Sequence, residues 1–252
     1  MVSAAIILAA GFGVRLGRNK PKPIVDVGGF KLFQLPLLSL MNVGVRKFYV
    51  VTQRRIMAQI SRHIGRLGVK NYSIIINDEP FRENGFSFYL GLKMAEENVL
   101  FVSMSDHIYP PQIPQKMLRS YNNSIDVLIA ADSDPIYIDV DEATKILVRN
   151  RKVVKIGKNL EEFNYVDAGL FLVNKRILPL VESYVRRKPV VRMSNIVNYL
   201  IEMGRKVYIA DITGEPWLDV DMPRELRRLI WGDAREILDA IISVSNSYGV
   251  FE

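Results

Sequence analysis

The sequence predicts a single α/β domain with a mixed, mostly parallel central sheet, and two observations carry that prediction. Short runs rich in β-branched residues alternate with stretches whose apolar residues recur at helical spacing. The alternation meets no Gly/Ser-rich linker, low-complexity tract or internal repeat in 252 residues. Such alternation is typical of right-handed crossover units that cover both faces of a Rossmann-like sheet.

The expected elements divide the chain into two parts. Strands are expected at residues 4–10, 47–52, 73–77, 99–103 and 127–131. Helices are expected between them, at residues 32–42, 54–67, 86–97 and 114–122. Later the pattern changes to hairpin-like strands at 147–148, 153–156 and 169–173, with helices at 175–187 and 194–203. We therefore expect one domain, 1–252, with a regular part at 1–130 and a β-hairpin and helical elaboration at 131–252.

The composition excludes several classes of protein. The chain has no cysteine, which excludes disulfides and thiolate metal sites. Its apolar runs, such as residues 4–10, are far shorter than the roughly 20 residues of a membrane-spanning helix, and no cationic leader precedes them. We therefore expect a soluble cytoplasmic protein without a membrane span.

The formal net charge of +7 could indicate a nucleic-acid surface, an anionic lipid surface or a cleft for small polyanions. The basic residues are scattered, and no basic stripe interleaved with aromatic residues occurs. Phosphorylated metabolites are therefore favoured over nucleic acid as partners.

Apolar residues near the C-terminus also recur at helical spacing. They are Leu226, Leu229, Ile230, Ile237, Leu238, Ile241 and Ile242. We expect core packing or a subunit contact in a homodimer rather than membrane association, because Asp233, Glu236 and Asp239 interrupt the basic polar face.

A glycine-rich turn follows the first expected strand. Gly11 and Gly13 lie in the run AAGFGVRLGRNKPKP, and glycines let backbone amides approach a ligand closely and form an anion-binding concavity. Two familiar motifs are absent: Leu16 stands where a dinucleotide fingerprint has glycine, and no Gly-Lys-Ser/Thr sequence follows. The turn is interpreted as a phosphate cradle of another kind.

Three cations accompany these glycines. Arg15 lies within the turn, and Lys20 and Lys22 alternate with two prolines. The prolines are expected to keep residues 20–23 extended, so that both lysines project to the same side. Three cations that face the same binding site would suit a polyphosphate ligand. The alternative is a tight turn whose lysines are solvated.

Two aspartates follow apolar runs and could bind a metal. Asp106 comes after the strand expected at 99–103, at the sheet edge where open α/β folds bind ligands, and Asp221 follows a short run that begins at Trp217. One or two carboxylates, completed by water and substrate phosphates, are sufficient for Mg²⁺. The alternatives are a turn-forming role for Asp106 and a helix N-cap role for Asp221 before Pro223.

Two neighbouring residues receive lesser roles. Asp219 would share a face with Asp221 in an extended chain and is a candidate for supporting the metal ligands. His107 follows Asp106 directly, so its side chain is expected to point the opposite way, and it is interpreted as structural.

The N-terminal run resembles the signature of sugar-phosphate nucleotidyltransferases. The matching residues are AAGxGxR at 9–15, followed by KPKPxVxVGGxxL at 20–32. The doubled KPKP, SDHI at 105–108, DEATK at 141–145 and WLDVD at 217–221 resemble the inositol-1-phosphate cytidylyltransferases of thermophilic archaea and bacteria. Val14 departs from the Ser or Thr of many relatives. The resemblance implies a nucleotide-diphospho-sugar transferase fold, with a nucleotide-binding half at 1–130 and an acceptor-binding half at 131–252.

The resemblance also implies roles for residues at matching positions. Arg15 and Lys22 would stabilise triphosphate charge, and Asp106 with Asp221 would bind Mg²⁺. The nucleotide would lie against Leu8, Ala9, Ala10, Gly11, Gly13, Lys22, Asn84, Gly85 and Ser87. The acceptor would contact Lys145, Lys158, Asp167 and Gly169. A helix N-cap loop at 84–87 and ordinary surface lysines are the alternatives.

The implied reaction transfers CMP from CTP to inositol-1-phosphate, giving CDP-inositol and pyrophosphate. No general base is needed, because a phosphate monoester has a second pKa of about 6 and is largely dianionic at neutral pH. The product would serve compatible-solute or phospholipid synthesis. In some relatives a membrane synthase domain follows, whereas this chain stops at Glu252, so we expect functional coupling to a separate membrane CDP-alcohol phosphotransferase.

Three alternatives are retained. Within the class, the chain could be a choline-phosphate-type cytidylyltransferase or a sugar-1-phosphate uridylyl- or guanylyltransferase. From another class, it could be an inactive nucleotide sensor or assembly subunit on the same fold. Joint retention of Arg15, Lys22, Asp106 and Asp221 argues against the last, because an inactive relative has no chemical need for all four.

Overall fold

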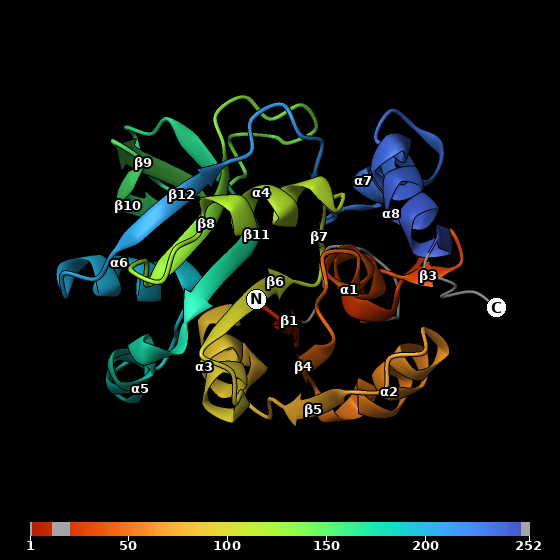
Figure 1. Ribbon diagram of the computed structural model, residues 1–252, viewed down its shortest axis with the longest axis horizontal. Helices are drawn as coiled ribbons and strands as arrows, with labels where there is room; N and C mark the ends of the chain where they lie inside the picture. The colour runs from red at the N-terminus through yellow and green to blue at the C-terminus, as the bar shows by residue number, and fades with distance from the viewer. Residues whose placement is uncertain (1, 12–20, 248–252) are drawn as a thin grey trace.

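The computed structural model describes residues 2–11 and 21–247 (Figure 1). In this part of the chain a nine-stranded sheet has the order β5-β4-β1-β6-β11-β8-β12-β10-β9. Its strands are β1 (Ala4–Ala9), β4 (Lys47–Thr52), β5 (Tyr72–Ile76), β6 (Val99–Met104), β8 (Val127–Asp132), β9 (Lys145–Arg149), β10 (Lys152–Gly157), β11 (Tyr165–Asn174) and β12 (Val207–Asp211).

The strand directions divide the sheet into two regions. Parallel pairing joins β5, β4, β1 and β6, and it also joins β8 to β12. β11 lies antiparallel between β6 and β8, and the β9–β10 hairpin forms the far edge. The predicted α/β fold with a mixed sheet and a hairpin elaboration is therefore confirmed, with most of the parallel pairing in the N-terminal part.

Helices cover both faces of this sheet (Figure 1). They are α1 (Gln34–Met41), α2 (Met57–Arg66), α3 (Asn84–Met94), α4 (Gln112–Ser120), α5 (Leu178–Arg187), α6 (Met193–Glu202), α7 (Pro223–Trp231) and α8 (Arg235–Ser247). Among the described residues, no helix combines the length and the apolar character that crossing a bilayer requires.

The central strand β1 supplies both hydrophobic cores, because successive side chains of a strand point to opposite faces. Ala5, Ile7 and Ala9 enter one core together with residues of α1, α2, α4, α7 and α8. Ala4, Ile6 and Leu8 enter the other core with residues of α3, α5 and α6. β1 is therefore buried along its whole length, and its carboxyl end lies between those of β4 and β6.

The C-terminal apolar pattern also enters the first core. Its buried members are Leu226, Leu229, Ile237, Leu238 and Ile241. The expected core packing of this pattern is confirmed. Trp231, at the end of α7, is instead 78% exposed.

Two short ribbons complete the described fold. β2 (Asp26–Val27) and β3 (Phe30–Lys31) form a hairpin whose turn residues, Gly28 and Gly29, have φ of 60° and 93°. β7 (His107–Ile108) pairs antiparallel with β13 (Leu218–Asp219). Neither ribbon was predicted from the sequence, and neither was β12.

Candidate active site

The β7–β13 ribbon brings three aspartates together from distant parts of the chain. Asp106 is the second residue after the end of β6, in a bend just before β7. Asp219 in β13 is the register partner of His107. The Val220 amide donates to the Asp106 carbonyl at 3.0 Å, and this bond extends the pairing toward Asp221. Asp106, Asp219 and Asp221 therefore lie at one edge of the central sheet.

Lys22 lies among these aspartates. Its Nζ is 2.5 Å from Oδ2 of Asp106 and 3.9 Å from Oδ1 of Asp219, and it donates a hydrogen bond to Oδ1 of Asp221. The Lys22 side chain is only 9% exposed. We call Lys22, Asp106, Asp219 and Asp221 the acidic cluster.

The carboxylates of the acidic cluster hold Lys22 in its charged form. Burial alone would lower the pKa of Lys22, but Asp106, Asp219 and Asp221 outweigh it and raise that pKa above its usual range. Burial would likewise raise the pKa of Asp106, but Lys22 and His107 hold it well below its usual range. Lys22 and Asp106 are therefore an ion pair at neutral pH.

The backbone around Lys22 differs from the extended chain expected at 20–23. Residues Lys22–Ile24 form one 3₁₀ turn, in which the Ile24 amide donates to the Pro21 carbonyl at 3.1 Å and the Val25 amide to the Lys22 carbonyl at 3.2 Å. The expected extension is wrong for Lys22, because the fixed φ of proline suits a helical first turn as well as an extended chain. Gly13, Arg15 and Lys20 lie outside the described residues.

Asp219 has the least satisfied carboxylate of the acidic cluster. Its buried Oδ1 has no hydrogen-bond donor within reach among the described residues. Burial, together with the charges of Asp106 and Asp221, raises the pKa of Asp219 to about 6 against the opposing effect of His107 and Lys22. The buried Oδ1 atom is therefore a ready ligand for a further cation.

His107 points toward the aspartates and not away from them. Its Nδ1 is 3.1 Å from Oδ1 of Asp106 and 3.8 Å from Oδ1 of Asp219. The expected opposite orientation is wrong, because Ser105 and Asp106 form a bend and strand alternation begins only at His107. Burial opposes protonation, but Asp219 and Asp106 raise the pKa of His107 to about 9.

The His107 ring has two close neighbours, Trp217 and Gly169. It stacks on Trp217 with the ring centroids 6.1 Å apart and the planes 13° from parallel. Trp217 is itself fixed by an indole N–H donated to Oδ2 of Asp132 at 2.8 Å. The ring also lies close to Gly169, where a β-carbon would come within 2.3 Å of His107 Cδ2.

The donor atoms of this region fit a metal ion. Ligand atoms of Asp106, His107 and Asp219 all lie within 4.8 Å of one another, and Asp221 adjoins them through Lys22. Carboxylate oxygens predominate, which suits a hard cation such as Mg²⁺. The unsatisfied Oδ1 of Asp219 is the observation that favours this fit.

The predicted phosphate-binding segment begins beside the acidic cluster. The Ser105 amide donates to the Leu8 carbonyl at 3.2 Å, which ties the residue before Asp106 to the end of β1. Beyond Leu8, Thr52 Oγ1 donates to the Ala9 carbonyl at 3.3 Å and Gln53 Nε2 to the Ala10 carbonyl at 2.7 Å. The chain that leads to Gly11 is therefore fixed by β4 and β6.

The residues predicted to read the base are helical. Asn84, Gly85 and Ser87 lie in the first turns of α3 and not in a loop before it. Asn84 Oδ1 accepts from the Met193 amide at 2.9 Å, and Ser87 Oγ accepts from Asn77 Nδ2 at 2.9 Å. A β-carbon at Gly85 would come within 2.7 Å of the Val191 carbonyl oxygen, so close packing also requires glycine there.

Gln53 and Asn77 are buried polar residues in this region that the sequence reasoning did not select. Each directly follows a parallel strand, Gln53 after β4 and Asn77 after β5. The rule that led to Asp106, a polar residue just beyond a strand at the carboxyl edge, could have found both.

Three of the predicted acceptor residues lie in β9 and β11, and Lys158 directly follows β10. Lys145 is paired with Gly157, the residue before Lys158, and also with Val166, the residue before Asp167. Asp167 Oδ1 accepts from the Gly169 amide at 2.8 Å, and burial raises the pKa of Asp167 to about 6. The ammonium of Lys145 lies 5.3 Å from the Phe163 ring centroid, and Lys158 is exposed.

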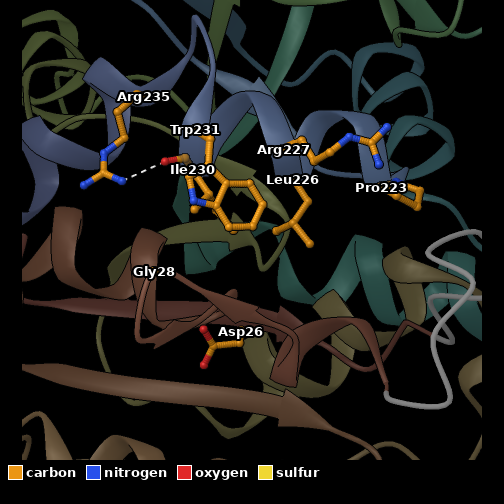
Figure 2. Close-up of a pocket in the computed structure, with 8 residues that line it drawn as sticks. All are labelled: Asp26, Gly28, Pro223, Leu226, Arg227, Ile230, Trp231 and Arg235. Atoms are coloured by element: carbon orange, nitrogen blue, oxygen red, sulfur yellow. Dashed lines mark hydrogen bonds between the residues drawn. The ribbon is translucent and has the colours of Figure 1, made fainter.

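A cavity of about 540 Å³ lies elsewhere, between α7 and the β2–β3 hairpin (Figure 2). Leu226 and Trp231 point from α7 toward Asp26 and Gly28 of the hairpin. Arg235 donates to the Ile230 carbonyl at 2.7 Å beside it. No residue predicted for the nucleotide, the acceptor or the metal lines this cavity.

Comparison with known protein families shows to which family of enzymes the chain belongs. Residues 5–191 match the model of the MobA-like NTP transferase domain. The chain belongs to this family. The matched range includes Lys22, Asp106 and Asp167, whereas Asp219 and Asp221 lie beyond it.

Curated relatives of this NTP transferase domain agree with the family that the sequence resembles. A bifunctional IPC transferase and DIPP synthase from Thermococcus kodakarensis is 35% identical over 224 residues, which are 89% of this chain and 49% of that protein. A protein of the same name from Archaeoglobus fulgidus is 34% identical over 89% of this chain and 42% of its own length. The chain thus spans about half the length of these relatives.

Solved structures extend the similarity to the whole fold. The inositol-1-phosphate CTP transferase from T. maritima superposes with a TM-score of 0.86 at 25% identity, covering 95% of this chain and 96% of that one. A putative glucose-1-phosphate thymidylyltransferase from Bacillus anthracis gives a TM-score of 0.77 at 17% identity, over 90% and 93% of the two chains. This second likeness shows the fold alone.

The contact between Gly169 and His107 can be tested with a matched pair of variants. Gly169 and Gly204 both have φ of 70°, but an added β-carbon at Gly204 meets nothing within 4 Å. Gly204→Ala should cost only backbone strain, about 1–2 kcal/mol. Gly169→Ala should cost a further ~1–3 kcal/mol from overpacking, measured by urea unfolding, and should shift the His107 imidazole resonances. His63, the only other histidine, is the internal reference. Equal losses with unshifted His107 signals would contradict the contact.

Proposed function

We propose that this chain transfers CMP from CTP to inositol-1-phosphate and releases pyrophosphate. The observation that carries the proposal is the meeting of Lys22 with Asp106 and Asp221 at the carboxyl edge of an NTP transferase sheet. The names of the Thermococcus and Archaeoglobus relatives and of the T. maritima structure support the acceptor and the donor.

The proposed reaction needs no proton transfer. A phosphate oxygen of the acceptor attacks the α-phosphorus of CTP in line, and the bond from this phosphorus to the oxygen bridging the β-phosphorus breaks. That oxygen leaves with the electron pair as part of pyrophosphate, and the other product is CDP-inositol. The acceptor phosphate enters as a dianion, because its second pKa is about 6. Charge stabilisation and positioning supply most of the acceleration.

Residues of the N-terminal segment would hold the triphosphate. The backbone of residues 8–13 would cradle the phosphates, and Arg15 and Lys22 would neutralise charge on the leaving pyrophosphate. Asp106 and Asp221 would hold Mg²⁺, which would neutralise phosphate charge and polarise the α-phosphoryl group. Asp219, whose Oδ1 lies 3.9 Å from Nζ of Lys22, would support this pair.

The base and the acceptor would bind on opposite sides of the acidic cluster. We propose that Asn84, Gly85 and Ser87 contact the base, together with the backbone of Ala9 and Ala10. On the other side Asp167 and Gly169 would contact inositol hydroxyls, and Lys145 and Lys158 would contact the acceptor phosphate. Residues 1–130 are accordingly the nucleotide-binding half, and residues 131–252 are the acceptor-binding half.

The wider setting is also a proposal. CDP-inositol is an activated alcohol, and we propose that a membrane CDP-alcohol phosphotransferase consumes it. The second activity in the names of the curated relatives, DIPP synthase, supports such a downstream step. A cytoplasmic location and a homodimer complete the proposal, and sedimentation in solution tests the dimer.

A substrate panel tests the reaction. Pyrophosphate release should be fastest with CTP and inositol-1-phosphate, and the nucleotide product should have the mass of CDP-inositol. Phosphocholine and hexose-1-phosphates, each with all four NTPs, are the competing acceptors. Faster turnover with phosphocholine, or with UTP or GTP and a hexose phosphate, would replace the proposed pair. No turnover with any pair would indicate a nucleotide-binding protein without catalysis.

Removal of either proposed metal ligand should abolish turnover. Asp106→Asn and Asp221→Asn each keep the side-chain shape but lose a charged oxygen, so kcat should fall at least roughly 100-fold. Asp239→Asn is the matched control, because Asp239 pairs with Arg235 on the surface of α8 at 2.8 Å. Near-normal kcat in Asp106→Asn or Asp221→Asn would refute the metal site.

Neutral lysine variants test the acceptor side. Lys145→Gln and Lys158→Gln should each raise the KM for inositol-1-phosphate about 10-fold, because each would remove one charge-assisted hydrogen bond. The KM for CTP should stay unchanged. Lys152→Gln, an exposed lysine at the start of β10, should change neither KM. If the KM for CTP rises together with the KM for inositol-1-phosphate, these lysines contact the nucleotide and not only the acceptor.

A further inference from the structure

The ammonium of Lys22 occupies the centre of the acidic cluster. Within the described residues, its recorded partners are carboxylate oxygens: Asp106 at 2.5 Å, Asp219 at 3.9 Å, and the hydrogen-bonded Asp221. Lys22 is thus a cation that the chain itself supplies to the oxygens proposed to bind metal.

An ammonium and a divalent metal cannot share these oxygens at low cost. Lys22 uses Oδ2 of Asp106 and Oδ1 of Asp221, the same kind of hard oxygen that Mg²⁺ requires. A metal on these atoms would lie within a few ångströms of Nζ, where two positive charges in a mostly buried site repel each other strongly. Metal binding therefore requires the ammonium to leave.

The chain around Lys22 lets the side chain move while its backbone stays in place. The Lys22 carbonyl accepts from the Val25 amide, and the neighbouring Pro23 carbonyl accepts from the Phe33 amide at 3.1 Å. Four flexible methylenes separate Nζ from this anchored turn. The carbonyl of Leu8, at the start of the segment proposed to bind the triphosphate, accepts from the amide of Ser105, the residue before Asp106, so a new anionic partner is expected near Lys22.

The charges of the acidic cluster favour such an exchange. The ammonium of Lys22 and the ring of His107 face three carboxylates, and the buried Oδ1 of Asp219 is left without a hydrogen-bond partner among the described residues. A divalent cation would neutralise the cluster more completely than Lys22 does. The triphosphate, in turn, would give the displaced ammonium a stronger set of anionic oxygens.

We propose that Lys22 is an exchangeable internal cation: it neutralises the acidic cluster in the metal-free protein and moves to the triphosphate when metal and nucleotide bind. The proposal rests on the proposed function, since it takes Asp106 and Asp221 as the metal ligands. Its consequence is positive cooperativity. Metal binding frees Lys22 for the nucleotide, and the nucleotide removes the competitor of the metal.

Calorimetry of the full chain with Lys22→Met tests this exchange. Methionine keeps most of the side-chain volume and removes the charge. Without nucleotide, Mg²⁺ should bind Lys22→Met at least about 10-fold more tightly than the wild type, because no ammonium has to be displaced. In EDTA the variant should unfold at a lower temperature than the wild type, and Mg²⁺ should remove this difference.

Lys31→Met is the matched control. It removes the same charge, but Lys31 pairs with Asp26 in the β2–β3 hairpin at 3.1 Å. Its Mg²⁺ affinity should equal that of the wild type. Unchanged or weaker Mg²⁺ binding in Lys22→Met, or no Mg²⁺ binding in either protein, would overturn the exchange.

Labelling of the wild type gives a second readout that does not depend on a stable variant. Acetic anhydride footprinting by mass spectrometry should find Lys22 protected in EDTA, several-fold more reactive with Mg²⁺ alone, and protected again with Mg²⁺ and CTP. Reactivity that does not change with Mg²⁺ would overturn the proposal. Both readouts report binding, so they stand apart from the substrate panel. If no substrate pair is turned over but the changes in Mg²⁺ affinity and Lys22 labelling are observed, the proposed reaction is refuted and the exchange stands.

Discussion

Repulsion among three carboxylates is the constraint around which this site is organised. Asp106, Asp219 and Asp221 would separate if only their side chains were involved, but backbone pairing between β7 and β13 fixes them at neighbouring positions. The energy of the surrounding fold, with β1 buried on both faces, sustains that pairing. Lys22 and His107 then offset the charge. The negative charge of these carboxylates thus explains why Lys22 and His107 lie at this edge of the sheet.

The regular part of the fold follows from local pattern. β1, β4, β6 and β8 are buried runs bounded by turns, and the helices between them carry apolar residues at helical spacing, so the sequence identifies both. The two-residue ribbon β7–β13 has no such pattern. Its pairing depends on contacts between residues more than 100 positions apart, which no local window contains. β12 was not predicted, although it is apolar and Gly204, with φ of 70°, separates it from α6.

The residues of the candidate site could be predicted from the sequence only where the sheet topology determines their position. Asp106 follows a parallel strand, and that position alone directs it to the carboxyl edge. The pairing of Asp106 with Asp221 came from the family resemblance and not from local pattern. The orientation of His107 was not predictable, because it depends on a bend at Ser105–Asp106 that no sequence pattern indicates. The turn at Lys22 was misjudged for a related reason: proline restricts φ but leaves ψ to be decided by tertiary hydrogen bonds.

The antiparallel strand β11 has a consequence for how such a domain changes over evolution. Because β11 runs against β6 and β8, its beginning lies at the edge where those strands end, so Asp167 and Gly169 come to the acidic cluster from the opposite chain direction. The segment that precedes them is the β9–β10 hairpin. Insertions or exchanges in that hairpin could therefore reshape the proposed acceptor side while the register of the proposed nucleotide half stays unchanged. One strand reversed in the sheet would let the two proposed substrate preferences diversify independently.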